Sequence, residues 1–122
     1  MIDEDLLKEN MQLYTDKVHM LNEVSEPSYQ LKIAIAQAEG QLAVTNDLYH
    51  YALTGEESDN TIHFQALAES LANYGAVTGK NFDFNDAFSN LDDMTIEIVE
   101  DIAYQQSWID TYKTYTYLDN SK

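Results

Sequence analysis

A formal net charge of −16 over 122 residues, from 22 carboxylates and six lysines without any arginine, dominates this chain. The charge disfavours nucleic acid and anionic membranes as direct partners, because both are bound through lysine and arginine, and the lack of cysteine excludes disulfides and thiolate metal sites. The hydrophobic content of 44% is enough for a folded core. No run reaches the roughly 20 apolar residues that span a bilayer, and the acidic start is unlike a signal peptide. We therefore expect one cytoplasmic helical domain over residues 1–122.

Pro27 separates the first two predicted helices, because proline cannot continue a helix, and Ser25 or Ser28 can cap the second one. Apolar residues in both segments recur at spacings of three and four, which is typical of one helix face. The second stripe is the clearest in the chain, is weakened only by Gly40, and ends at the polar segment 54–60. The stripes are Leu6, Leu7, Met11, Tyr14, Val18 and Leu21, and then Leu31, Ile35, Ala38, Leu42, Thr45, Tyr49 and Ala52.

A third helix is predicted from Thr61 to about Val77, with Gly75 or Gly79 at its end. The segment 80–90 alternates phenylalanine with aspartate and asparagine, which fits a short strand or an irregular loop, and we favour a loop whose rings enter the core. The residues expected to point inward from the third helix are Ile62, Leu67, Leu71 and Tyr74.

The fourth long helix is predicted to start near Asn90. Its end stays open, because residues 114–117 have a strand-like composition but also fit a fraying last turn. Long amphipathic helices joined by short connections predict an all-α fold, a single-domain antiparallel four-helix bundle with an aromatic-rich loop before the last helix. The inward stripe of the last helix is expected to be Leu91, Met94, Ile98, Ile102, Ile109 and Tyr112.

Two segments resemble ligand-binding loops but lack essential residues. Residues 75–81 have three residues between the glycines instead of four, and asparagine instead of serine or threonine after Lys80, so they do not form a phosphate-binding loop. Residues 83–94 begin like a calcium loop, but Phe88 and Met94 occupy the positions that require glycine and glutamate. We expect neither ligand.

Two Asp-x-x-His pairs, Asp16 with His19 and Asp47 with His50, each place both side chains on one helix face. Di-iron helical bundles use Glu-x-x-His pairs together with further glutamates, which the inward stripes here do not supply. We favour surface or boundary histidines, although the metal-binding alternative stays open. We expect no metal, no cofactor and no enzymatic activity, because the sequence shows no nucleophile motif and no identifiable catalytic constellation.

The segment from Asn81 to Asp110 carries eight carboxylates and no lysine. At 100° per residue, four of them share one sector of the last helix, where they recur every ~5–6 Å and flank two aromatic residues. Acidic residues on an outer helix face are most often simply solvated. We nevertheless predict that this acidic surface binds a basic protein, because without arginine the chain has few means to neutralise these carboxylates internally. The predicted partner-binding residues are Asp93, Glu97, Glu100 and Asp101, extended by Asp83, Asp86 and Asp92 and anchored by Tyr104 and Trp108.

In charge, size and predicted helicity, the chain resembles phage- and plasmid-encoded DNA mimics that block restriction or CRISPR nucleases, and the acidic immunity partners of nuclease toxins. That resemblance implies a basic, nucleic-acid-binding protein as the partner. The alternative is a phage-type structural or assembly protein that self-associates through its carboxy-terminal aromatic residues, and a homodimer stays open in either case.

Overall fold

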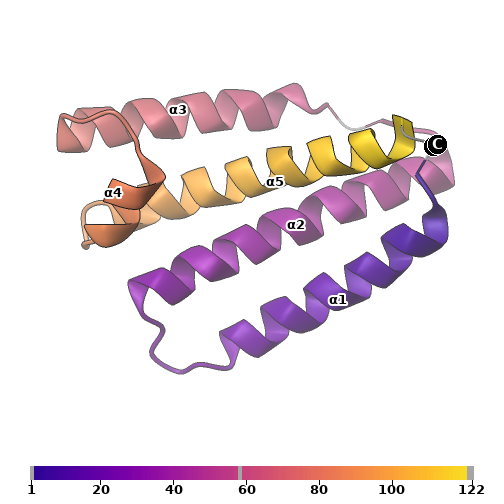
Figure 1. The fold of residues 1–122 in the computed structure, drawn as a ribbon, viewed down its shortest axis with the longest axis horizontal. Coiled ribbons are helices and arrows are strands. Elements are labelled where there is room, and N and C mark those ends of the chain that lie inside the picture. Colours follow the sequence, from indigo (N-terminus) through magenta and orange to yellow (C-terminus); the bar gives the residue numbers. More distant parts are fainter. Residues whose placement is uncertain (1, 58, 121–122) are drawn as a thin grey trace.

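The computed structural model describes residues 2–57 and 59–120, which contain five helices (Figure 1). The helices are α1 (Glu4–Asn22), α2 (Tyr29–Thr54), α3 (Thr61–Thr78), α4 (Phe84–Ser89) and α5 (Ile96–Asn120). The prediction of an all-α fold is confirmed. None of the helices in the described ranges is long and apolar enough to cross a membrane.

The four long helices lie side by side in the order α1, α2, α5, α3 (Figure 1). The contacts between elements agree with this order, since α2 packs against α1 and α5, and α3 packs against α5. Neighbours α1 and α2 run in opposite directions, as do α3 and α5, whereas the central helices α2 and α5 run in the same direction. The predicted antiparallel four-helix bundle is therefore not confirmed in this detail.

Two hydrogen bonds fix the parallel register of α2 and α5. The Ser107 hydroxyl donates to the backbone carbonyl of Gln37 over 2.7 Å. The hydroxyls of Thr45 and Tyr115 lie 2.9 Å apart. Both pairs are separated by 70 positions in the sequence, so the two helices advance together along their length.

Gly40 lies at a close contact between α2 and α5. A Cβ atom at this position would stand 2.5 Å from the carbonyl oxygen of Tyr104, a backbone atom that cannot turn aside. Glycine permits such a close approach because it has no side chain. The residue that weakens the predicted stripe of α2 is thus the one that lets α5 pack against it.

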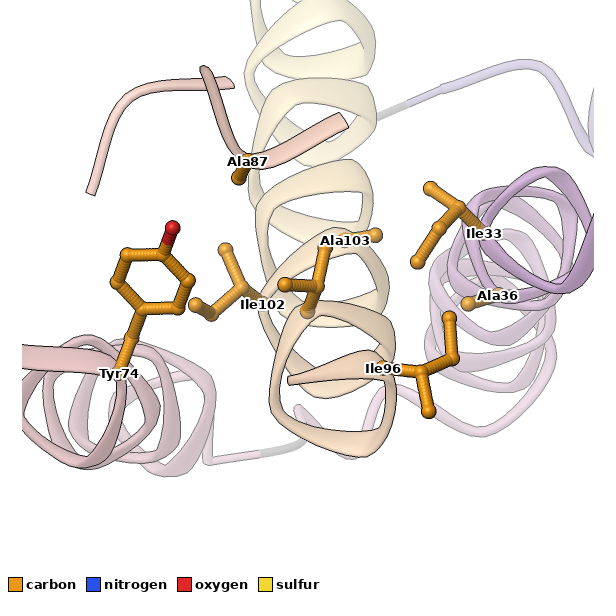
Figure 2. Close-up of a cluster of buried hydrophobic side chains, with 8 residues drawn as sticks. Ile33, Ala36, Tyr74, Ala87, Ile96, Ile102 and Ala103 are labelled. Carbon is orange, nitrogen blue, oxygen red and sulfur yellow. The ribbon is translucent and has the colours of Figure 1, made fainter. Parts of the chain in front are cut away.

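Buried side chains form two clusters, and α5 contributes to both. Figure 2 shows the first cluster, with Tyr74 of α3 on one side of α5 and Ile33 of α2 on the other. Because α5 is covered from two sides, its buried positions surround the helix instead of following one stripe. The first cluster contains Ile33, Ala36, Tyr74, Ala87, Ile96, Val99, Ile102 and Ala103, and the second contains Leu7, Val44, Trp108, Ile109 and Tyr115.

A chain of polar contacts crosses the second cluster. The Thr45 hydroxyl donates to the carbonyl of Gln41 over 2.7 Å, so its oxygen accepts from the Tyr115 hydroxyl. The Asn10 side-chain amide donates in turn to the Tyr115 oxygen over 3.0 Å. These hydrogen bonds give the buried Thr45 hydroxyl its partners, which a buried polar group needs, and they connect α1, α5 and α2. Helix α5 continues through residues 114–117, so the strand-like composition there does not form a strand.

The predicted loop at residues 80–90 contains the short helix α4, with Asp83 as its N-cap. Phe82 and Phe88 pack against the first cluster, as expected of rings that enter the core, but Phe84 is exposed, against that expectation. Ring centroids are 4.8 Å apart for Phe82 and Phe84 and 5.3 Å apart for Phe84 and Phe88, in edge-to-face pairs. Aromatic pairs favour this geometry, while Ala87 joins α4 to Ile96 and Val99 of α5 in the first cluster.

Three residues expected to point inward are exposed: Ile62 by 55%, Leu71 by 37% and Met94 by 72%. The two on α3 are exposed because α3 packs along one side only, against α5. Met94 is exposed because it lies in the turn before α5, which starts at Ile96 and not near Asn90. Periodicity identified the apolar positions but not how many neighbours each helix would have.

Candidate functional site: an acidic face on α2 and α5

The predicted partner-binding carboxylates lie at the beginning of α5. Glu97 and Asp101 are exposed one turn apart on the helix, and Glu100 between them is half-buried. Asp93 is exposed but lies in the turn before α5. The prediction that Asp93 shares a helix sector with Glu97 is therefore wrong, because the helix begins later than expected.

Packing of α5 against α2 changes the electrostatics of Glu100. Burial raises the pKa of the Glu100 carboxyl above its ordinary value, because a charged carboxylate is less well solvated there. Lys32 of α2 opposes this rise by attraction. The negative charges of Asp101, Glu97 and Glu39 reinforce it. Glu39 lies on α2, so carboxylates of the two helices act on each other across their contact.

Tyr104 of α5 also lies close to carboxylates of α2. Burial raises the pKa of its hydroxyl, and the charges of Asp47 and Glu39 on α2 raise it further. We define the acidic face as Glu39, Glu97, Glu100 and Asp101, with Tyr104 at its edge. Sequence reasoning missed Glu39, because nothing in a single helix pattern shows that α2 and α5 lie in parallel register.

The three carboxylates expected to extend the surface have structural roles. Asp83 accepts a hydrogen bond from the backbone N–H of Asn85 over 2.9 Å and caps α4. Asp92 accepts from the backbone N–H of Thr95 over 2.9 Å, and its own N–H donates to the Thr95 hydroxyl over 3.2 Å, a reciprocal cap before α5. Asp86 pairs with Lys80 over 3.7 Å. These contacts stabilise local structure, so the three residues are not placed solely for a partner.

Trp108 is buried, with 1% of its surface exposed, so the prediction that it anchors the edge of the surface is wrong. The His63 ring of α3 stacks on the indole with a centroid distance of 3.9 Å. The indole N–H donates to Asp47 of α2 over 3.2 Å, and Tyr112 stacks at 5.3 Å. The sector that carries acidic residues near the beginning of α5 is covered by α2 and α3 farther along the helix.

Carboxylates are not confined to the acidic face. Another group gathers where α1 begins and α2 ends, at the end of the molecule opposite the start of α5 (Figure 1). Helix α3, by contrast, carries one carboxylate, Glu69, and no lysine. We call the second group the acidic end, which comprises Asp3, Glu4, Asp5, Glu56, Glu57 and Asp59.

The two Asp-x-x-His pairs lie on different helices, Asp16 with His19 on α1 and Asp47 with His50 on α2. Both histidines are exposed. Within residues 2–57 and 59–120, no group of three or more histidines, aspartates or glutamates is arranged to hold a metal ion.

Comparison with known proteins gave no match: no family model, no curated protein and no solved structure shows significant similarity to the chain.

Proposed function

We propose that this protein binds a basic, nucleic-acid-binding protein through the acidic face and occupies its nucleic-acid site, as a DNA-mimic inhibitor of a nuclease, restriction enzyme or CRISPR effector would. The observation that carries the proposal is the rigid placement of Glu39, Glu97, Glu100 and Asp101 on two helices in contact. Helices that pack around Gly40 and share hydrogen bonds hold these charges at fixed positions.

The spacing of the charges suits a site that binds phosphates. Glu97, Glu100 and Asp101 lie within five residues of α5, and the first and last are four positions, or about 6 Å of helix, apart. A strand of B-DNA carries roughly two phosphates over the same length, at about 3.4 Å per phosphate. A lysine- or arginine-lined groove can therefore meet carboxylates where it would otherwise meet phosphates, and long-range attraction would speed association at low salt.

A pull-down from host lysate tests the proposal. The wild-type protein, immobilised at low salt, should retain a basic DNA- or RNA-binding protein that elutes as salt rises, and it should compete with nucleic acid for that protein. The double variant Glu97→Lys with Asp101→Lys should weaken binding at least tenfold, because it replaces attraction by repulsion.

The matched control reverses Glu9 and Asp16, two exposed carboxylates on α1, and changes the net charge by the same amount. This control should bind within about threefold of the wild type, because it leaves the acidic face intact. An equal loss of affinity in both double variants, or no loss in the first, would show that the acidic face is not the binding surface.

Self-association through the carboxy-terminal aromatic residues, as expected from the sequence, is not supported, because Trp108 and Tyr115 are buried. A second candidate function, assembly by self-association, is favoured instead by α3. Phe64 and Leu71 are exposed and lie seven positions apart, on one side of the helix, and Glu69 is its one carboxylate, so two copies could meet there with little charge repulsion. Light scattering should then show a dimer or larger oligomer that persists at high salt and dissociates in Phe64→Gln. A monomer under all salt conditions would exclude this alternative.

A further inference from the structure

A cavity of about 360 Å³ opens at the acidic end, beyond the acidic face along α5. Three aromatic side chains line it: Tyr51 from α2, and Trp108 and Tyr112 from α5. Cavities of roughly 300 Å³ or more with apolar walls and a few polar groups are the usual sites for small ligands. The stacking of Trp108 between neighbours keeps this wall rigid.

The charged residues among the described lining of the cavity are carboxylates. Asp47 and Glu57 line it, and none of the described residues around it is a lysine. The hydrogen bond from the Trp108 indole N–H to Oδ2 of Asp47 holds that carboxylate in place. The carboxylates of the acidic end are close in sequence to residues that line the cavity, such as Ile2 and Asn60, and they add to the negative potential there.

Aromatic rings combined with fixed carboxylates recognise organic cations. Trp108 stacks between His63 and Tyr112, so the rings whose faces can meet a cation are those of Tyr51 and Tyr112. Such rings attract a cation through their negative faces and also cover its carbon chain, and the carboxylates accept charge-assisted hydrogen bonds from guanidinium or ammonium N–H groups. We propose that this cavity binds a small organic cation with a guanidinium or primary ammonium group, paired with Asp47 and Glu57. This proposal does not rest on the acidic face.

Trp108 is the sole tryptophan of the chain, so its fluorescence reports directly on the cavity. Titration with agmatine at fixed pH and ionic strength should give a saturable change. N-butylurea, a neutral analogue of similar shape, should give none. A short blocked peptide with one arginine distinguishes the source: saturation by agmatine alone indicates a free amine, and saturation by both indicates an arginine side chain of a protein.

Asp47→Asn keeps an oxygen that can accept from the indole N–H, and Glu57→Gln keeps the size of the side chain. Each should weaken agmatine binding by about tenfold or more, the effect of losing one charge-assisted hydrogen bond. Glu69→Gln on α3 removes the same charge away from the cavity and should leave binding within about twofold. The proposal is overturned by no saturable signal, by equal binding of N-butylurea, or by unchanged affinity in both cavity variants.

Discussion

Glu100 experiences both the packing of the helices and the charge of the acidic face. Burial raises its pKa, so the folded protein holds the Glu100 proton more tightly than the unfolded chain does. The charged form therefore opposes folding above the raised pKa, and protonation removes that cost as the pH falls. A carboxylate at this half-buried position lowers the stability of the fold. Perturbed groups of this kind are frequent at functional sites, so the cost is compatible with a functional role for Glu100.

Glu100→Gln should be more stable than the wild type near pH 7, because the amide needs no charge at this half-buried position. The difference should shrink as the pH falls through the raised pKa towards the ordinary value of 4.5, where the wild-type carboxyl becomes neutral too. Thermal denaturation of both proteins across this pH range measures the effect. Glu97→Gln, at an exposed position on the same helix, is the control, and an equal pH-dependent gain there would show that burial of Glu100 is not the cause.

Asp92 was predicted to contact a partner, but its hydrogen bonds show a cap. Asp92→Ala should lower the free energy of unfolding by about 1 kcal/mol, because the backbone N–H groups before α5 lose their acceptor. Asp92→Asn should lose much less, since the amide oxygen still accepts. Urea denaturation distinguishes the two variants, and equal losses would mean that the charge of Asp92, and not its capping, stabilises the fold.

Among the elements, α2 and α5 form the contact on which the acidic face depends. Gly40→Ala should lower the free energy of unfolding by about 1–3 kcal/mol, because the new methyl group meets the Tyr104 carbonyl and forces the helices apart. Gly75→Ala on α3 is the matched control. Its Cβ would stand 3.6 Å from the Lys80 carbonyl oxygen, an ordinary contact, so alanine should raise stability by up to about 1 kcal/mol. A gain of similar size in both variants would show that helix propensity, and not the close contact, governs position 40.

The four long helices were predictable because apolar spacing, Pro27 and the glycines are local signals. Gly55 and Gly79 end α2 and α3 with positive φ angles, as helix-terminating glycines commonly do. The short helix α4 was missed, because six residues give too little periodicity to distinguish a helical turn from a loop.

The pairing of helices could not be predicted, because a hydrophobic stripe shows which side is apolar but not which helix covers it. Trp108 illustrates the difficulty: its spacing from Tyr104 places both on one side of α5, yet Trp108 is buried, with the His63 ring of α3 stacked on it, and Tyr104 is half-buried. Glu39 illustrates the converse, since it joins the candidate site only through the register of α2 against α5.

For the whole molecule, the helices lie side by side in the order α1, α2, α5 and α3 (Figure 1). None of the aspartates and glutamates in the described part of the chain is buried. Charges of one sign on both ends of the molecule repel each other in the folded state more than in the expanded chain. Stability should therefore depend on ionic strength as well as on local contacts.

Raising NaCl from about 10 mM to about 150 mM shortens the Debye length from ~30 Å to ~8 Å, so the melting temperature should rise as repulsion between the two ends is screened. KCl at equal ionic strength should give the same rise, because screening does not depend on the identity of the cation. Two double variants test whether the repulsion acts over the whole molecule: Glu97→Lys with Asp101→Lys, and the reversal of Glu9 and Asp16. Both should melt at a higher temperature than the wild type at low salt, and the melting temperature of both should depend less on added salt. The two variants should lose this salt dependence to a similar extent, although only the first should lose its partner. A melting temperature that is flat or falls with salt would show that local ion pairs, such as the one between Lys80 and Asp86, outweigh the repulsion.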